Sequence, residues 1–79
     1  MDKEHVKTVL TKEIATELAV APGEIDEHAS FMRLGISSVQ ALKIINRLRK
    51  ELGIDINPVA LFEFKTIEDI SDFLAEDDD

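Results

Sequence analysis

The chain has 79 residues, no cysteine, and a net charge of −8 that comes from 17 acidic and 9 basic side chains. This length corresponds to one small domain, and without cysteine neither a disulfide nor a thiolate metal site can support its core. The acidic balance argues against nucleic acid as a partner, because such binding depends on lysine and arginine neutralising phosphates.

No hydrophobic run approaches the about 20 residues that a helix needs to span a bilayer. The N-terminal segment, residues 1–5, lacks the basic and then apolar pattern of a signal peptide. We therefore expect a cytoplasmic protein without membrane contacts. Its net charge, which reduces non-specific association, favours a monomer.

The first predicted element is an amphipathic helix from Asp2 to about Val20. Apolar residues at every fourth position give it one buried stripe. They are Val6, Leu10, Ile14 and Leu18. We expect Asp2 to cap this helix, and Pro22 with Gly23 to end it.

Residues 21–36 form a long connection, and loops beyond about 12–15 residues are uncommon in small domains unless they pack or serve a function. We expect its apolar residues to tie it to the helices. They are Ile25, Phe31, Met32, Leu34 and Ile36. Gly35 is expected in a backbone conformation that a side chain would hinder.

Ser37 and Gln40 have the spacing of a capping box, which predicts a second helix from Ser38 to about Leu52. Ser38 then occupies the first helical position. There the free backbone N–H groups and the helix dipole would stabilise a phosphate on its hydroxyl. By itself the stretch favours a plain helix start, because serine is among the best capping residues.

The second helix separates apolar from basic residues. Its inward stripe is predicted to comprise Ala41, Ile44, Ile45, Leu48 and Leu52, widened by Leu42. The opposite stripe comprises Gln40, Lys43, Arg47 and Lys50. Residues 38–52 carry a net charge of +3, so the rest of the chain carries −11.

Two further helices complete the prediction. Asn57 caps a short helix over residues 58–63, and an apolar cluster nearby is expected to fill the core; it comprises Val59, Leu61, Phe62 and Phe64. Thr66 caps the last helix, whose apolar face comprises Ile67, Ile70, Phe73 and Leu74.

Residues 76–79 are expected to form a frayed, solvated acidic tail. Neither this tail nor the two histidines, His5 and His28, has the ligand spacing of a metal site.

The order Phe31-x-x-Leu34-Gly35-x-x-Ser38-x-x-Ala41, followed by Asn46-Arg47-Leu48, resembles the attachment motif of acyl and peptidyl carrier proteins. The segment from Leu61 to Ile67 is similar to that family's LFxYPT segment, with Phe64 in place of Tyr and Lys65 in place of Pro. The family commonly has Asp before the modified serine, where this chain has Ser37.

This resemblance implies an all-α domain over residues 1–79, a small four-helix bundle of three longer helices and one short helix with a long first loop. It implies that Ser38 carries 4′-phosphopantetheine, donated by coenzyme A and attached by a phosphopantetheinyl transferase that uses Mg²⁺. The thiol of that arm would hold acyl groups as thioesters. The chain would then be a non-catalytic carrier with no metal site of its own, and its own sequence contains no convincing set of nucleophile, base and orienting group.

The resemblance also implies partner enzymes that load, condense and modify the acyl group. We expect Lys43 and Arg47 to set partner choice by charge, and Val39 to offer an apolar contact. Val39 has an equal alternative, which is to close the top of the bundle. The missing Asp at residue 37 puts the choice of transferase in question, but not the attachment site.

The segments Asn46-Arg47-Leu48 and LFxF look most like carrier domains of modular polyketide synthases. A peptidyl carrier of a nonribosomal peptide synthetase and a fatty acid carrier are the alternatives, although fatty acid carriers usually have an acidic second helix. An alternative of another class is an unmodified helical protein–protein interaction module. That module would explain the bundle and its charge, but not the position of Ser38 within the motif.

Overall fold

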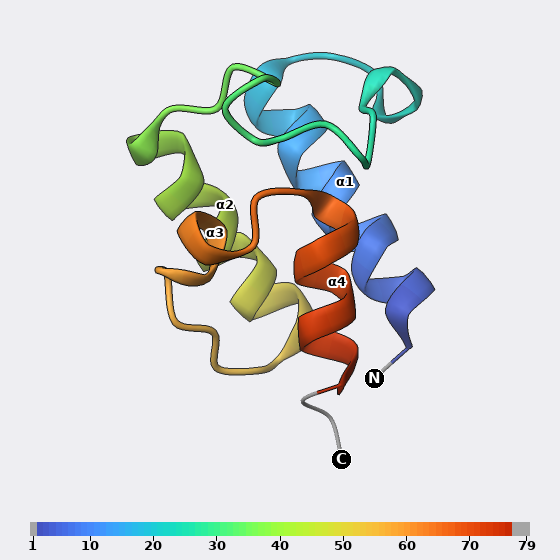
Figure 1. The fold of residues 1–79 in the computed structure, drawn as a ribbon, viewed down its shortest axis with the longest axis vertical. Coiled ribbons are helices and arrows are strands. Elements are labelled where there is room, and N and C mark those ends of the chain that lie inside the picture. The colour runs from blue at the N-terminus through green and yellow to red at the C-terminus, as the bar shows by residue number, and fades with distance from the viewer. Residues whose placement is uncertain (1, 77–79) are drawn as a thin grey trace.

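Three longer helices and one short helix make up the regular structure of residues 2–76, the part of the chain that the computed structural model describes (Figure 1). They are α1 (Lys3–Leu18), α2 (Ser38–Leu52), α3 (Ala60–Glu63) and α4 (Ile67–Glu76). This arrangement confirms the all-α four-helix prediction. The expected acidic tail lies outside the described residues, except that α4 extends to its first residue, Glu76.

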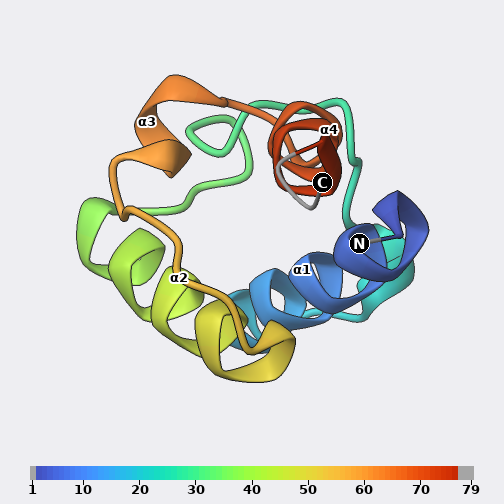
Figure 2. The same ribbon diagram turned by 90° about the horizontal axis from the view of Figure 1, so that it is seen from below.

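The helices surround one apolar core, with α1 in contact with both α2 and α4 (Figure 2). The apolar faces predicted for the helices supply most of it. Fully buried side chains are Val6, Leu10, Ile14, Ile44, Ile45, Leu48, Ile67 and Ile70. Because these residues recur every three or four positions on their helices, burying them fixes which face of each helix points inward.

Helix α1 begins at its predicted cap but ends earlier than predicted. The Asp2 carboxylate accepts a hydrogen bond from the Glu4 N–H at 3.1 Å. The helix ends at Leu18 because Ala19 adopts a left-handed conformation, with φ of 58°. The Val20 N–H then bonds back to the Ala15 carbonyl at 3.0 Å, so the predicted end at about Val20 was two residues too late. The proline expected to end the helix instead opens a 3₁₀ turn, Pro22–Glu24.

The first loop crosses one end of the bundle, at the opposite end from the start of α1 (Figure 1). Phe31 is buried and anchors the loop, and its N–H donates to the Lys65 carbonyl at 2.8 Å. Gly35 has φ of 87°, as predicted. Met32 was predicted to pack but is 87% exposed. The hydrogen bond from the Ile36 N–H to the Phe31 carbonyl closes a turn, and Met32 lies on the outer side of this turn.

Helix α2 has the predicted bounds, but its inward stripe is narrower than predicted. Leu42 was expected to widen the stripe and is instead exposed. Leu52 is partly buried and packs on the edge of the core. An α-helix that packs on one side buries a limited arc, and Ala41, Ile44 and Ile45 already fill it.

Helix α3 starts two residues later than predicted, because residues 57–59 form a turn. Asn57 caps that turn: its side-chain oxygen accepts from the Val59 N–H at 3.0 Å. The prediction that the whole apolar cluster fills the core was wrong for Val59 and Phe62, which are exposed, since a helix of four residues can turn only part of its surface inward. Leu61 is buried.

Helix α4 is capped as predicted, since the Thr66 hydroxyl accepts from the Asp69 N–H at 3.0 Å. The prediction that Phe73 belongs to the buried face was wrong, because Phe73 is exposed. Its ring stacks on that of Phe64, with ring centroids 4.4 Å apart. This contact joins α4 to the segment that follows α3.

Candidate functional site

The two serines at the start of α2 have different environments. The Ser37 hydroxyl accepts from the Gln40 N–H at 3.2 Å, and the Gln40 side chain accepts from the Ser37 N–H at 2.9 Å. The predicted capping box is therefore present. Ser38 is exposed and is the first residue of α2, and no described residue hydrogen-bonds to its hydroxyl. Ser37 is occupied by a structural task, whereas the Ser38 hydroxyl is available.

A pocket of ≈ 500 Å³ opens beside these serines, and both line it. Its inner wall includes Phe31 and Leu61, which are buried. Exposed side chains complete the lining, among them Phe62 and Lys65. The volume falls within the range of sites that hold small molecules. The fold thus places an apolar hollow directly next to the hydroxyl that the motif singles out.

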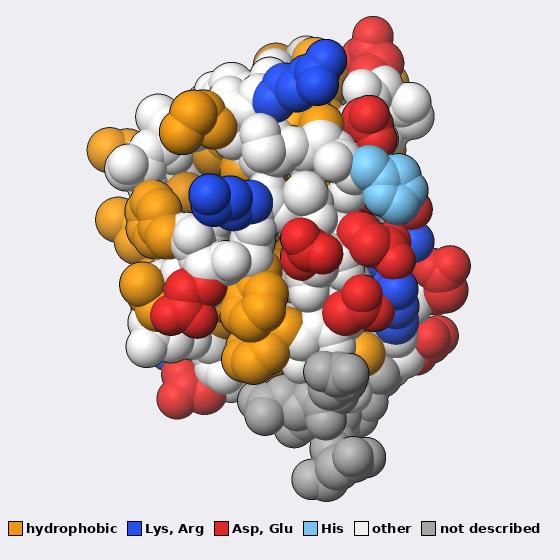
Figure 3. All heavy atoms as spheres, in the orientation of Figure 1, with side chains coloured by type: hydrophobic (Ala, Val, Ile, Leu, Met, Phe, Trp, Pro, Cys, Tyr) orange, Lys and Arg blue, Asp and Glu red, His pale blue; other side chains and the backbone are white. Residues whose placement is uncertain are grey.

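Three large apolar side chains are exposed on the segments that surround this pocket. Met32 is 87% exposed, Val39 is 64% exposed and Phe62 is 54% exposed, and they come from the loop, α2 and α3 respectively. Figure 3 shows hydrophobic side chains gathered over α3, on one side of the molecule, and acidic side chains concentrated over α4 and α1. The sequence pattern indicated Val39 but not Met32 or Phe62, because a periodic pattern does not tell which residues of a loop or one-turn helix face outward.

The exposure of Val39 excludes its structural alternative, since a residue 64% exposed does not close the bundle. Lys43 is exposed on α2 and makes no ion pair within residues 2–76.

Arg47, by contrast, is paired: its guanidinium lies 3.0 Å from Glu17 and 3.9 Å from Glu13 of α1. Both glutamate side chains are poorly exposed, at 11% and 8%. Arg47 therefore joins α1 to α2, a contact that the sequence pattern did not predict.

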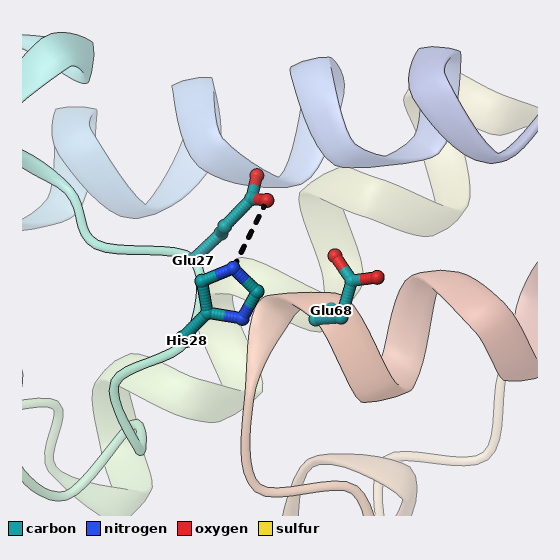
Figure 4. Close-up of side chains that lie close together, drawn as sticks. All are labelled: Glu27, His28 and Glu68. Carbon is teal, nitrogen blue, oxygen red and sulfur yellow. Dashed lines mark ion pairs between the residues drawn. The ribbon is translucent and has the colours of Figure 1, made fainter.

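A second cluster of polar side chains lies where the loop meets α4. Glu27, His28 and Glu68 have potential ligand atoms within 4.8 Å of one another (Figure 4). Lys7 already pairs with both carboxylates, at 2.9 Å from Glu27 and 3.1 Å from Glu68. Lys3 also pairs with Glu68. A divalent cation would have to displace these ammonium groups, so we interpret the cluster as an ion-pair network that joins the loop, α1 and α4.

The network shifts the acidity of its members. Hydrogen bonds from Lys3 and then Lys7 lower the pKa of the Glu68 carboxyl to about 2. Hydrogen bonds to Glu27 and then Glu68 raise the pKa of the Lys7 ammonium. Glu68 and Lys7 are therefore charged near neutral pH, and their ion pairs hold the loop against α1 and α4. The Glu68 N–H adds a hydrogen bond to the Glu27 carbonyl at 3.2 Å.

The family model for the phosphopantetheine attachment site matches residues 8–74. The chain belongs to this family of carrier domains, which bind 4′-phosphopantetheine covalently. The match confirms the resemblance drawn from the loop and the start of α2. In the part of the chain that is described, no helix is long and apolar enough to cross a membrane.

Named relatives agree with this family. The bikaverin polyketide synthase of Gibberella fujikuroi is 32% identical over 65 residues, which cover 82% of this chain and 3% of that protein. Polyketide synthase PksM of Bacillus subtilis is 32% identical over 63 residues, which cover 80% of this chain and 2% of that protein. The chain therefore spans a small fraction of the length of the curated relatives it matches.

Two solved structures share the fold. A free-standing peptidyl carrier protein from a secondary metabolic pathway of Acinetobacter baumannii has a TM-score of 0.89 at 25% identity, covering 96% of this chain and 95% of that one. A carrier domain of the CurA module from Lyngbya majuscula has a TM-score of 0.84 at 21% identity, covering 95% of this chain and 76% of that one.

The residues of this chain fit the prosthetic group. An exposed serine hydroxyl with no structural task supplies an attachment point, and the neighbouring pocket supplies an apolar surface. The start of a 15-residue helix adds backbone N–H groups and a positive dipole end that would stabilise a phosphate attached at Ser38.

Because Ser37 caps α2 and the Ser38 hydroxyl makes no hydrogen bond to a described residue, replacing each serine with alanine should affect stability differently. Ser37→Ala removes the acceptor of the Gln40 N–H and should lower the free energy of unfolding by about 0.5–2 kcal/mol. Ser38→Ala should change it by less than about 0.5 kcal/mol. Thermal unfolding followed by circular dichroism measures both, and an equal loss in the two variants would contradict the assignment.

The ion-pair network predicts loss of stability in acid. The pKa of Glu68 is lower in the folded state than its ordinary value of 4.5, so its contribution is complete above pH 4.5 and is lost as the pH falls toward 2. Glu68→Gln should therefore flatten the fall in Tm over this range. Glu63→Gln, which changes an exposed carboxylate on α3 outside the network, should leave the fall unchanged. If the Tm of both variants falls with pH as steeply as the Tm of the protein without substitutions, the network does not stabilise the fold.

Proposed function

We propose that Ser38 is the residue that carries 4′-phosphopantetheine in this carrier domain. The observation that supports this most directly is the contrast between the two serines. Ser37 is engaged in both hydrogen bonds of the capping box, and Ser38 is exposed, free of such bonds and beside the pocket. The motif spacing from Leu34 and Gly35 selects the same residue.

The attached arm would supply a thiol that holds acyl groups as thioesters, which this cysteine-free chain has no side chain to do. The chain's own residues would anchor the group and present it, without catalysing a reaction on it. A phosphopantetheinyl transferase would attach the group, and we place this step in the cytoplasm, where the donor coenzyme A is available.

We infer a role in polyketide biosynthesis, because the curated relatives named above are polyketide synthases. A peptidyl carrier is the second candidate. It is supported by the solved peptidyl carrier protein, which is free-standing and is covered almost end to end by this chain. In either pathway the partners would be enzymes that load, condense and modify the acyl group.

Partner enzymes would meet a surface whose charge differs from that of the whole chain. Residues 28–50 contain five lysines and arginines and no acidic residue, although the chain as a whole is strongly acidic. Lys43 and Val39 are exposed within this segment and are suited to charge steering and apolar contact. Arg47 is 41% exposed, so it could add to partner recognition while it holds α1.

The test of the attachment site is the intact mass of the protein before and after incubation with coenzyme A, Mg²⁺ and a broad-specificity phosphopantetheinyl transferase. We expect a gain of one phosphopantetheine in the unmodified sequence and in Ser37→Ala, and no gain in Ser38→Ala. If the gain disappears only in Ser37→Ala, the attachment site is Ser37 and our assignment to Ser38 is wrong. No gain in any folded sample would favour the unmodified interaction module.

Charge reversal on α2 should separate recognition from stability. Lys43→Glu should weaken binding to a partner enzyme and leave Tm unchanged, because Lys43 has no ion pair within the described chain. Arg47→Glu should also lower the free energy of unfolding, by about 1–3 kcal/mol, since it sets a carboxylate against two poorly exposed glutamates. Calorimetric titration with the transferase and thermal melting measure the two effects. A large fall in Tm for Lys43→Glu would make that residue structural.

A further inference from the structure

The pocket beside Ser38 has one charged side chain among the described residues that line it, that of Lys65. The rest of its lining is apolar or carries hydroxyl groups, and no carboxylate borders it. Such a pocket is complementary to a ligand that combines a hydrocarbon part with a single negative charge.

The main chain holds Lys65 in place at this pocket. Its carbonyl accepts from the N–H of Phe31 at 2.8 Å, and the adjacent Thr66 forms an isolated bridge with Ser30. The segment after α3 is thereby fastened to the loop that leads into α2. The Lys65 side chain is exposed, and no ion pair joins it to another residue within residues 2–76. Its charge is thus uncompensated at the pocket.

We propose that Lys65 pairs with the phosphodiester of the prosthetic group and holds the first part of the arm against the apolar lining of the pocket. This inference rests on the proposed attachment at Ser38, and it assigns a positioning role to a residue outside the attachment motif. The phosphodiester would be tethered at Ser38, which lines the same pocket, so the lysine would meet it at a high effective concentration.

No acidic side chain at the attachment point opposes the charge of Lys65. Ser37, which precedes Ser38, is uncharged, and no carboxylate lines the pocket. A negatively charged phosphodiester at Ser38 is therefore attracted by Lys65 without repulsion from a neighbouring acidic residue.

A carboxylate on the acyl cargo is the other anion that could reach Lys65. The two sources differ in when the interaction appears. Pairing with the phosphodiester is present once the arm is attached, even when its thiol is free. Pairing with the cargo appears only after the thiol carries a carboxyacyl group.

The experiment measures Tm for the unmodified and the phosphopantetheinylated forms of each variant, at low and high salt. Intact mass first verifies one arm per chain. In the protein without substitutions, attachment of the arm with a free thiol should raise Tm by about 2–6 °C at low salt, and by less at high salt. Lys65→Gln should remove the salt-dependent part of this rise, and Lys65→Arg, which keeps the charge, should retain it.

Lys12→Gln is the matched control, because it removes one exposed lysine from α1, which does not line the pocket. It should retain the full rise. An equal rise in Lys65→Gln and Lys12→Gln would overturn the proposal, as would a dependence on Lys65 that appears in a succinyl-loaded form but not in the free-thiol or acetyl-loaded forms. If neither the protein without substitutions nor any variant gains the arm, both the proposed function and the inference about Lys65 are wrong. Complete attachment without a dependence on Lys65 refutes this inference alone.

Discussion

The reciprocal hydrogen bonds between Ser37 and Gln40 are the interaction on which the site depends. They satisfy backbone and side-chain groups at the start of α2 and thereby fix the residue at which the helix begins. Because Ser37 is used in this way, the next residue, Ser38, becomes the first helical residue with an uncommitted hydroxyl. If the helix began one residue later, Ser38 would be the capping residue and Val39 the first helical residue.

Loop anchoring extends this constraint to the rest of the site. The Phe31 ring is buried, and its N–H is bonded to the segment after α3. Four residues earlier, Glu27 pairs with Lys7 of α1, which also pairs with Glu68 of α4. These two anchors fasten the middle of the loop to α1, to α4 and to the segment after α3. The pocket beside Ser38 exists because the loop, α2 and α3 each contribute one wall and none of them fills it.

The distribution of charge gives this small domain two unlike sides. Helix α4 carries four acidic residues and no basic residue, and Lys3 and Lys7 of α1 pair with two of them, whereas residues 28–50 are basic and include the proposed attachment point. The two sides meet at Arg47, which reaches from α2 to Glu17 on α1. That contact combines stability and surface charge in one residue. Exposed apolar residues, Met32 and Phe62, add a hydrophobic component to the basic side.

The sequence by itself determined the helical class, the start and end of α2, the caps at Asp2, Ser37 and Thr66, and the residue singled out for attachment. These features depend on local hydrogen bonds and on periodic apolar residues, and both are encoded over a few neighbouring positions. Tertiary structure alone decided which apolar residues of the loop and α3 remain exposed, that Arg47 pairs with α1, and that Lys65 borders the pocket. Those outcomes depend on contacts between segments distant in the chain, whose geometry no local spacing specifies.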